Sequence, residues 1–144
     1  MNVTLNAENH DHILSFPRDI LLVEDNPADI RLIKEALKNE ATENELHAVI
    51  NGADALNYLI EQSESEHYPD IIILDLNLPK MNGFEFLKKI KNNEKLCKIP
   101  IVVFTTSSSE EDELKCYDMG ANSYITKPVD FDGFKHIMKQ LNKL

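Results

Sequence analysis

The amino-acid sequence predicts an α/β fold in which five helices cover both faces of a five-stranded parallel sheet. Two apolar runs, Ile20 to Val23 and Ile71 to Leu74, are short and contain no alternating polar residues. Strands of this kind are buried on both faces, as in a parallel sheet covered by helices. Residues with helical spacing follow each predicted strand, and parallel neighbours need such a crossover connection.

The first half of the sequence alternates strand and helix. Asn26 and Pro27 predict a helix start after the first strand, because asparagine is a favoured cap and proline suits the first helical position. Apolar residues then recur at helical spacing: Ile30, Ile33, Ala36 and Leu37. An alternating strand is predicted at Leu46, Ala48 and Ile50, and a second helix begins after Gly52.

The second half continues this alternation. The strand that ends at Leu74 is followed by a third predicted helix, which contains Phe84, Leu87 and Ile90. The remaining elements are a strand at residues 101–104, a helix at 110–119, a strand at 124–126 and a closing helix that contains Phe134, Ile137, Met138 and Leu141. Residues 1–18 are polar and aperiodic, so we expect a loose leader followed by one domain over residues 19–144.

The composition excludes several classes of function. The 144 residues carry a formal net charge of −10, which disfavours binding to nucleic acid or to an anionic membrane. No apolar run is long enough to span a bilayer, and the N-terminus lacks the features of a signal peptide. The two cysteines, Cys97 and Cys116, lack the close spacing of metal or redox motifs. We therefore expect a cytoplasmic protein with reduced thiols.

Polar residues follow four of the predicted strands. Ligands of parallel α/β sheets bind at the carboxyl ends of the strands, so these side chains should meet in one crevice. They are Glu24, Asp25, Asp75, Thr105 and Lys127. Three carboxylates and one ammonium leave surplus negative charge, which a divalent cation would offset. All-oxygen ligands suit Mg²⁺ or Mn²⁺.

These residues together resemble the receiver domain of response regulators in two-component signalling. The resemblance covers about residues 19–142. It depends on the acids after the first strand, the block LDLNLPKMNG around the third strand end, Thr105 after the fourth strand and Lys127-Pro128 after the fifth. It implies a flavodoxin-like, doubly wound sheet with strand order 2-1-3-4-5.

The resemblance implies roles for the residues in the crevice. Asp75 would be the phosphoacceptor, taking a phosphoryl group from a phosphohistidine of a sensor histidine kinase. Lys127 would pair with the phosphoryl oxygens. Asp25, Asp75 and the backbone carbonyl of Asn77 would bind Mg²⁺, with Glu24 holding a metal-bound water and Mn²⁺ as the alternative ion. No organic cofactor is expected.

Two further residues would carry the signal, again by resemblance. On phosphorylation, the hydroxyl of Thr105 would bond a phosphoryl oxygen and Tyr124 would turn inward. This change would bias the face made by the fourth helix, fifth strand and fifth helix. Pro128 is expected to follow a cis peptide bond that aims Lys127 inward.

The segments EDNPAD and TTSSSEED resemble stand-alone receivers paired with phytochrome-type histidine kinases. A stand-alone receiver signals in trans, so we expect a downstream protein target that the sequence does not identify. Dimerisation through the output face is a further hypothesis. The implied activity is metal-assisted self-phosphorylation with slow autodephosphorylation rather than enzymatic turnover.

Three other functions remain as alternatives. A phosphatase of the haloacid-dehalogenase type also uses an aspartate at a strand end, but its D-x-D motif would need an acid where this chain has Asn77. A flavodoxin needs a hydroxyl- and glycine-rich phosphate loop after the first strand, where this chain has acids. A receiver-like module that docks partners without phosphorylation would have no need of the full residue set.

Overall fold

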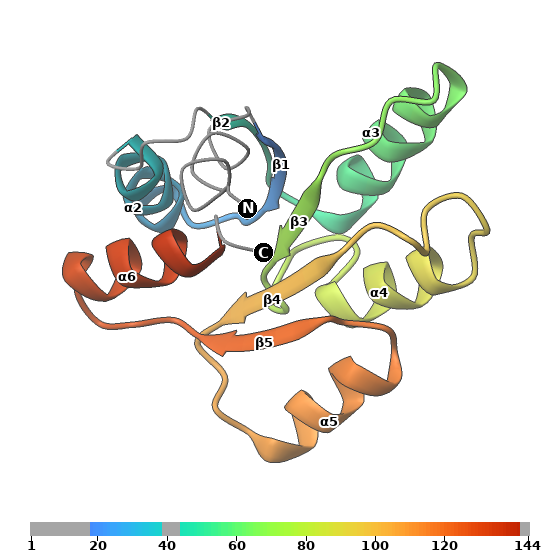
Figure 1. Ribbon diagram of the computed structural model, residues 1–144. Coiled ribbons are helices and arrows are strands. Elements are labelled where there is room, and N and C mark those ends of the chain that lie inside the picture. The colour runs from blue at the N-terminus through green and yellow to red at the C-terminus, as the bar shows by residue number, and fades with distance from the viewer. Residues whose placement is uncertain (1–17, 39–43, 142–144) are drawn as a thin grey trace, which may run out of the picture.

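The computed structural model describes residues 18–38 and 44–141 of the chain. Strands and helices alternate along it, beginning with a strand (Figure 1). They are β1 (Arg18–Val23), α2 (Pro27–Lys38), β2 (Asn44–Val49), α3 (Gly52–Glu64), β3 (Ile71–Leu74), α4 (Gly83–Lys91), β4 (Ile101–Thr105), α5 (Glu110–Asp118), β5 (Ser123–Thr126) and α6 (Phe131–Leu141).

The five strands form one parallel sheet in the order β2-β1-β3-β4-β5, which confirms the predicted fold and strand order. The first strand lies between β2 and β3, and its last residue, Val23, is in register with Leu74 of β3. The backbone segments that follow β1 and β3 therefore lie side by side at the carboxyl edge of the sheet.

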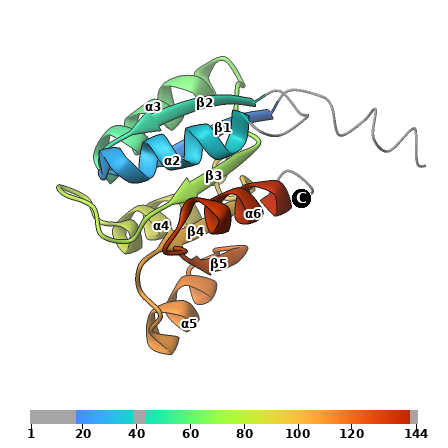
Figure 2. The ribbon, with the colours of Figure 1, turned by 90° about the vertical axis from the view of Figure 1, so that its left-hand side faces the viewer.

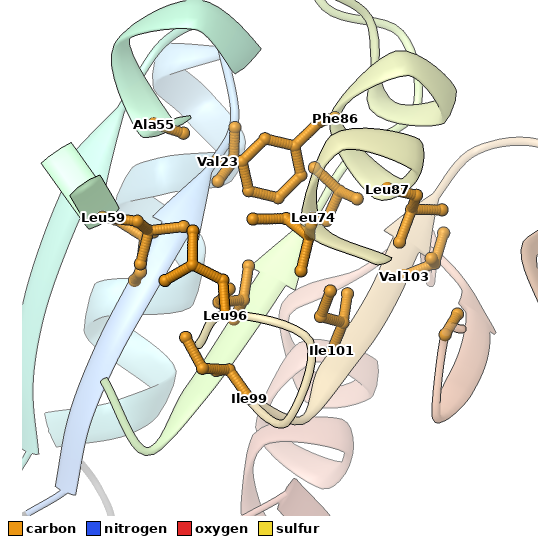
Figure 3. Packing of buried hydrophobic residues seen from close by; sticks show 14 of the residues in the cluster. Val23, Ala55, Leu59, Leu74, Phe86, Leu87, Leu96, Ile99, Ile101 and Val103 are labelled. Atoms are coloured by element: carbon orange, nitrogen blue, oxygen red, sulfur yellow. The ribbon is translucent and has the colours of Figure 1, made fainter. Parts of the chain in front are cut away.

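Helices cover both faces of the sheet (Figures 1 and 2). On one face, α2 and α6 lie side by side and bury a cluster that includes Ile33 and Phe134 against Leu22 and Ile73. On the other face, α3, α4 and α5 bury a second cluster (Figure 3). Its strand residues include Val23, Leu74 and Val103. All four residues of β3 are buried, as its continuous apolar sequence predicted.

Local sequence determines where several helices begin. The side chain of Asn26 accepts hydrogen bonds from the backbone N–H groups of Ala28 and Asp29, at 2.9 and 3.1 Å, which confirms the predicted cap. A capping box between Asn82 and Glu85 begins α4. The prediction for the second strand was partly wrong, because β2 ends before Ile50 and that side chain is 56% exposed.

The first and last described elements are joined directly. The guanidinium Nη1 of Arg18, at the start of β1, donates to the backbone carbonyl of Leu141 at 3.2 Å. Apart from Arg18, the expected leader falls outside the described residues, so its looseness and the domain boundary stay predictions. Among the helices of the described segments, none is both long and apolar enough to cross a membrane.

Candidate phosphoryl-transfer site

Three acids converge where β1 and β3 end. Glu24 and Asp25 follow β1, and Asp75 follows β3, whose register with β1 places the two strand ends together. One carboxylate oxygen from each of the three residues lies within 4.8 Å of one from each of the others. Glu24 and Asp75 are buried and Asp25 is exposed, so the group opens to solvent on one side.

Lys127 reaches this group from the end of β5. Its backbone N–H donates to the carbonyl of Thr105 at 2.7 Å, which fixes the chain at the edge of the sheet. Its side chain is 6% exposed, and its Nζ lies 2.7 Å from Glu24 Oε1 and 3.4 Å from Asp75 Oδ2. A third carboxylate, Asp29 on the first turn of α2, lies 2.8 Å from the same Nζ.

Burial and charge oppose each other in this crevice. Burial raises the pKa of Glu24 to about 7, and the nearby negative charge of Asp75 acts in the same direction, while the hydrogen bond from Lys127 lowers the pKa. Burial also lowers the pKa of Lys127, but its hydrogen bonds to Asp29 and Glu24 outweigh that effect and raise this pKa. Lys127 is therefore an ammonium at neutral pH.

The donor set fits a hard divalent cation. The Lys127 ammonium contacts the carboxylates of Glu24, Asp29 and Asp75, and the nearby carboxylate of Asp25 adds to the excess of negative charge. All the candidate ligand atoms are oxygens, which Mg²⁺ and Mn²⁺ prefer. The exposed Asp25 leaves room for water ligands, which Mg²⁺ usually retains.

A second network, made of hydroxyl and backbone groups, lies at the ends of β4 and β5, and the Ser107 hydroxyl ties it to the Asp112 carboxylate of α5 at 2.8 Å. Thr105 is fully buried, and its hydroxyl oxygen accepts a hydrogen bond from the backbone N–H of Ser107 at 3.4 Å. The hydroxyl of Tyr124 donates to the carbonyl of Ser107 at 2.9 Å, and that of Thr126 donates to the same carbonyl at 3.4 Å. Thr105 and Tyr124 are thus linked through one residue of the β4–α5 loop.

The loop after β3 is fixed close to Asp75. The backbone N–H of Asn77 lies 3.5 Å from Asp75 Oδ1, and the N–H of Gly83 donates to the carbonyl of Leu76 at 3.0 Å. A Cβ at Gly83 would lie only 2.6 Å from the carbonyl oxygen of Asp75 and from the Cα of Leu76. The first turn of α4 therefore packs directly on the backbone that carries Asp75.

The structure brings together most of the residues that the sequence singled out, and it adds one. Glu24, Asp25, Asp75 and Lys127 meet in one crevice. Sequence reasoning missed Asp29, although its position three residues after the cap Asn26 places it on the turn that faces the crevice. The expected cis bond before Pro128 is wrong, because the described residues contain no cis peptide bond. A backbone hydrogen bond from Lys127 to Thr105 ties the lysine to the edge of the sheet.

Comparisons with known proteins point to one family. The model of the response regulator receiver domain matches residues 20–139. Response regulator Rcp1 of Synechocystis sp. (strain ATCC 27184 / PCC 6803 / Kazusa) is 46% identical over 113 residues, which are 77% of this chain and 77% of that protein.

Two solved structures agree with this match. The phosphorylated cyanobacterial phytochrome response regulator RcpA is 43% identical, with a TM-score of 0.81 over 88% of this chain and 91% of that chain. The Mn²⁺-bound form of response regulator Rcp1 is 38% identical, with a TM-score of 0.79 over 89% of this chain and 94% of that chain. The chain therefore belongs to the response regulator receiver family.

Proposed function

We propose that Asp75 accepts a phosphoryl group from a sensor histidine kinase. Receivers accept phosphoryl groups from histidine kinases, typically on an aspartate, and they are generally not turnover enzymes. The observation that carries the proposal for this chain is the position of Asp75, where the end of β3, the other acids and the Lys127 ammonium converge. A buried carboxylate beside an ammonium is well placed to receive an anionic group.

The chemistry is a displacement at phosphorus. An oxygen of Asp75 forms a bond to phosphorus as the P–N bond of the phosphohistidine breaks. The leaving imidazole nitrogen keeps the electron pair and takes up a proton. Lys127, 3.4 Å from Asp75 Oδ2, is within reach of the phosphoryl oxygens and stabilises their negative charge. Slow hydrolysis of the aspartyl phosphate then resets the protein.

We propose Mg²⁺ as the resident ion, with Mn²⁺ as the alternative. Asp25, Asp75 and the backbone carbonyl of Asn77 would hold it, and Glu24 would hold one of its waters. When bound, the ion supplies positive charge that offsets the incoming phosphoryl oxygens. The clustered carboxylates and the existence of an Mn²⁺-bound structure of Rcp1 support this site.

We propose that Thr105 and Tyr124 transmit the change at Asp75. If the Thr105 hydroxyl turns toward a phosphoryl oxygen, it leaves the N–H of Ser107, whose carbonyl holds the Tyr124 hydroxyl. A change at Thr105 would therefore reach β5 through the loop before α5. The output face would be formed by α5, β5 and α6, and α5 carries the exposed apolar side chains of Leu114 and Tyr117.

The partners of this face belong to the same proposal. The similar protein RcpA is a phytochrome response regulator, which supports a phytochrome-type histidine kinase as the phosphodonor of this chain. The signal would pass in trans to a downstream protein from the α5, β5 and α6 face. Dimerisation through this face on phosphorylation is a further hypothesis. Sedimentation that shows the same mass with and without phosphorylation would contradict it.

Intact-mass spectrometry tests the phosphoacceptor. The wild type, incubated with acetyl phosphate and Mg²⁺, should gain one phosphoryl group, and Asp75→Asn should gain none. Addition of a chelator should abolish the gain. A gain of equal size in Asp75→Asn would overturn the assignment of Asp75. No gain in the wild type with either metal would favour a module that docks partners without phosphorylation.

A further inference from the structure

Asp29 shares the lysine of the site although it stands outside the group of three carboxylates. Its Oδ2 lies 2.8 Å from Lys127 Nζ, closer than the 3.4 Å between Nζ and Asp75 Oδ2. The cap residue Asn26 accepts hydrogen bonds from the backbone of that same helical turn, including the N–H of Asp29. Asp29 is therefore held in place by a capped turn of α2.

The bonding capacity of Lys127 is already filled. An ammonium has three N–H donors, and its Nζ lies within 4 Å of three carboxylates, those of Glu24, Asp29 and Asp75. A phosphoryl group on Asp75 would bring several more acceptor oxygens and more negative charge into the crevice. Lys127 can donate to those oxygens only if it gives up one of its present partners.

Asp29 is the partner that costs least to release. The side chain of Glu24 is 1% exposed, so water cannot replace the hydrogen bond that it would lose with Lys127, whereas that of Asp29 is 19% exposed and can be hydrated more readily. Asp75 keeps a carbonyl oxygen in the crevice as an acceptor for Lys127 after its other oxygen has bonded to phosphorus. The geometry therefore favours an exchange in which the phosphoryl oxygens replace Asp29.

We propose that Asp29 is a positioning residue that restrains Lys127 before phosphorylation and slows the transfer of a phosphoryl group to Asp75. This inference rests on the proposed function of Asp75. Without the Asp29 carboxylate, Lys127 keeps Glu24 and Asp75 and has an N–H group free for the incoming phosphoryl group. The restraint also ties the first turn of α2 to the phosphorylation state of the site.

The rate of phosphorylation tests this role. Asp29→Asn should be phosphorylated by acetyl phosphate and Mg²⁺ roughly three- to tenfold faster than the wild type, as expected from the loss of one partly exposed ion pair. Glu35→Gln, which removes the same charge from the same helix at a residue paired with Lys38, is the matched control and should react at the wild-type rate. A rate for Asp29→Asn no higher than that of Glu35→Gln would overturn the proposal.

A metal-free measurement tests the ion pair independently of phosphorylation. The urea midpoints of the wild type, Asp29→Asn, Lys127→Met and the double variant are compared in the presence of a chelator. Asp29→Asn should raise the midpoint in the Lys127→Met background, where it relieves repulsion among acids, and should lower it or raise it less when Lys127 is present. Equal changes in both backgrounds would show that the two residues do not interact and would overturn the role.

The two experiments separate this inference from the proposed function. If the wild type gains no phosphoryl group, both the phosphoacceptor assignment and the role of Asp29 are contradicted. If the wild type is phosphorylated and Asp29→Asn reacts no faster, only the role of Asp29 is contradicted. Faster phosphorylation of Asp29→Asn together with coupling to Lys127 supports both.

Discussion

The carboxyl edge of the sheet has a charged half, in which carboxylates near the ends of β1 and β3 bond the Lys127 ammonium, and a neutral half, in which hydroxyl groups of β4 and β5 bond the Ser107 backbone. In the charged half, Glu24, Asp29 and Asp75 share the ammonium of Lys127. In the neutral half, Tyr124 and Thr126 share the carbonyl of Ser107. Buried unpaired charges cost far more free energy than broken neutral hydrogen bonds, so the first half is suited to chemistry and the second to small rearrangements.

The largest expected effect is at the ammonium that joins the two halves. Lys127→Met should lower the free energy of unfolding by about 3 kcal/mol, because it leaves the buried Glu24 and Asp75 without a counter-charge. Urea denaturation without metal measures this. Lys38→Met removes an exposed lysine and should change stability by less than about 0.5 kcal/mol. Equal losses in the two variants would mean that the charged half is not held by Lys127.

An intermediate effect is expected at Gly83, where α4 packs on the backbone of Asp75. Alanine in a helix normally stabilises relative to glycine by about 0.5–1 kcal/mol. Here its Cβ would lie 2.6 Å from the Asp75 carbonyl oxygen, so Gly83→Ala should instead destabilise by about 1–3 kcal/mol. It should also slow phosphorylation, since the acceptor must shift. A rise in the thermal midpoint would show that the loop yields easily.

The smallest effect is expected in the neutral half. Tyr124→Phe removes the hydrogen bond to the Ser107 carbonyl and should cost about 1 kcal/mol, because Thr126 still donates to that carbonyl. Tyr117→Phe, on the exposed surface of α5, should leave the urea midpoint unchanged. A loss for Tyr124→Phe as large as that for Lys127→Met would erase the distinction between the two halves.

The strands and helices could be predicted from the sequence because its local signals agree, whereas the strand order followed from the resemblance to receivers. The continuous apolar runs that end at Val23 and Leu74 indicate strands covered on both faces, and both are buried. Asparagine followed by proline at residues 26 and 27 marked the start of α2. By contrast, the alternation that included Ile50 did not indicate where β2 ends, because an exposed isoleucine satisfies the same pattern.

The site was only partly predictable. Acids at the ends of neighbouring parallel strands must meet, so Glu24, Asp25 and Asp75 could be grouped from topology alone. The ion pair of Asp29 with Lys127 joins residues 98 positions apart and depends on the orientation of a helical turn, which periodicity does not specify. The trans peptide bond before Pro128 was likewise not predictable, because a Lys-Pro sequence is compatible with either isomer.

The hydrogen bond between Arg18 and Leu141 can form only after nearly all of the described chain has been synthesised. The buried cluster under α3, α4 and α5 has all of its members by Ala121, whereas the cluster under α2 and α6 also needs Phe134, Met138 and Leu141. A nascent chain can therefore finish one face of the sheet while the other still exposes its isoleucines and valines. Until α6 leaves the ribosome, that uncovered face is where chaperones or aggregation would act.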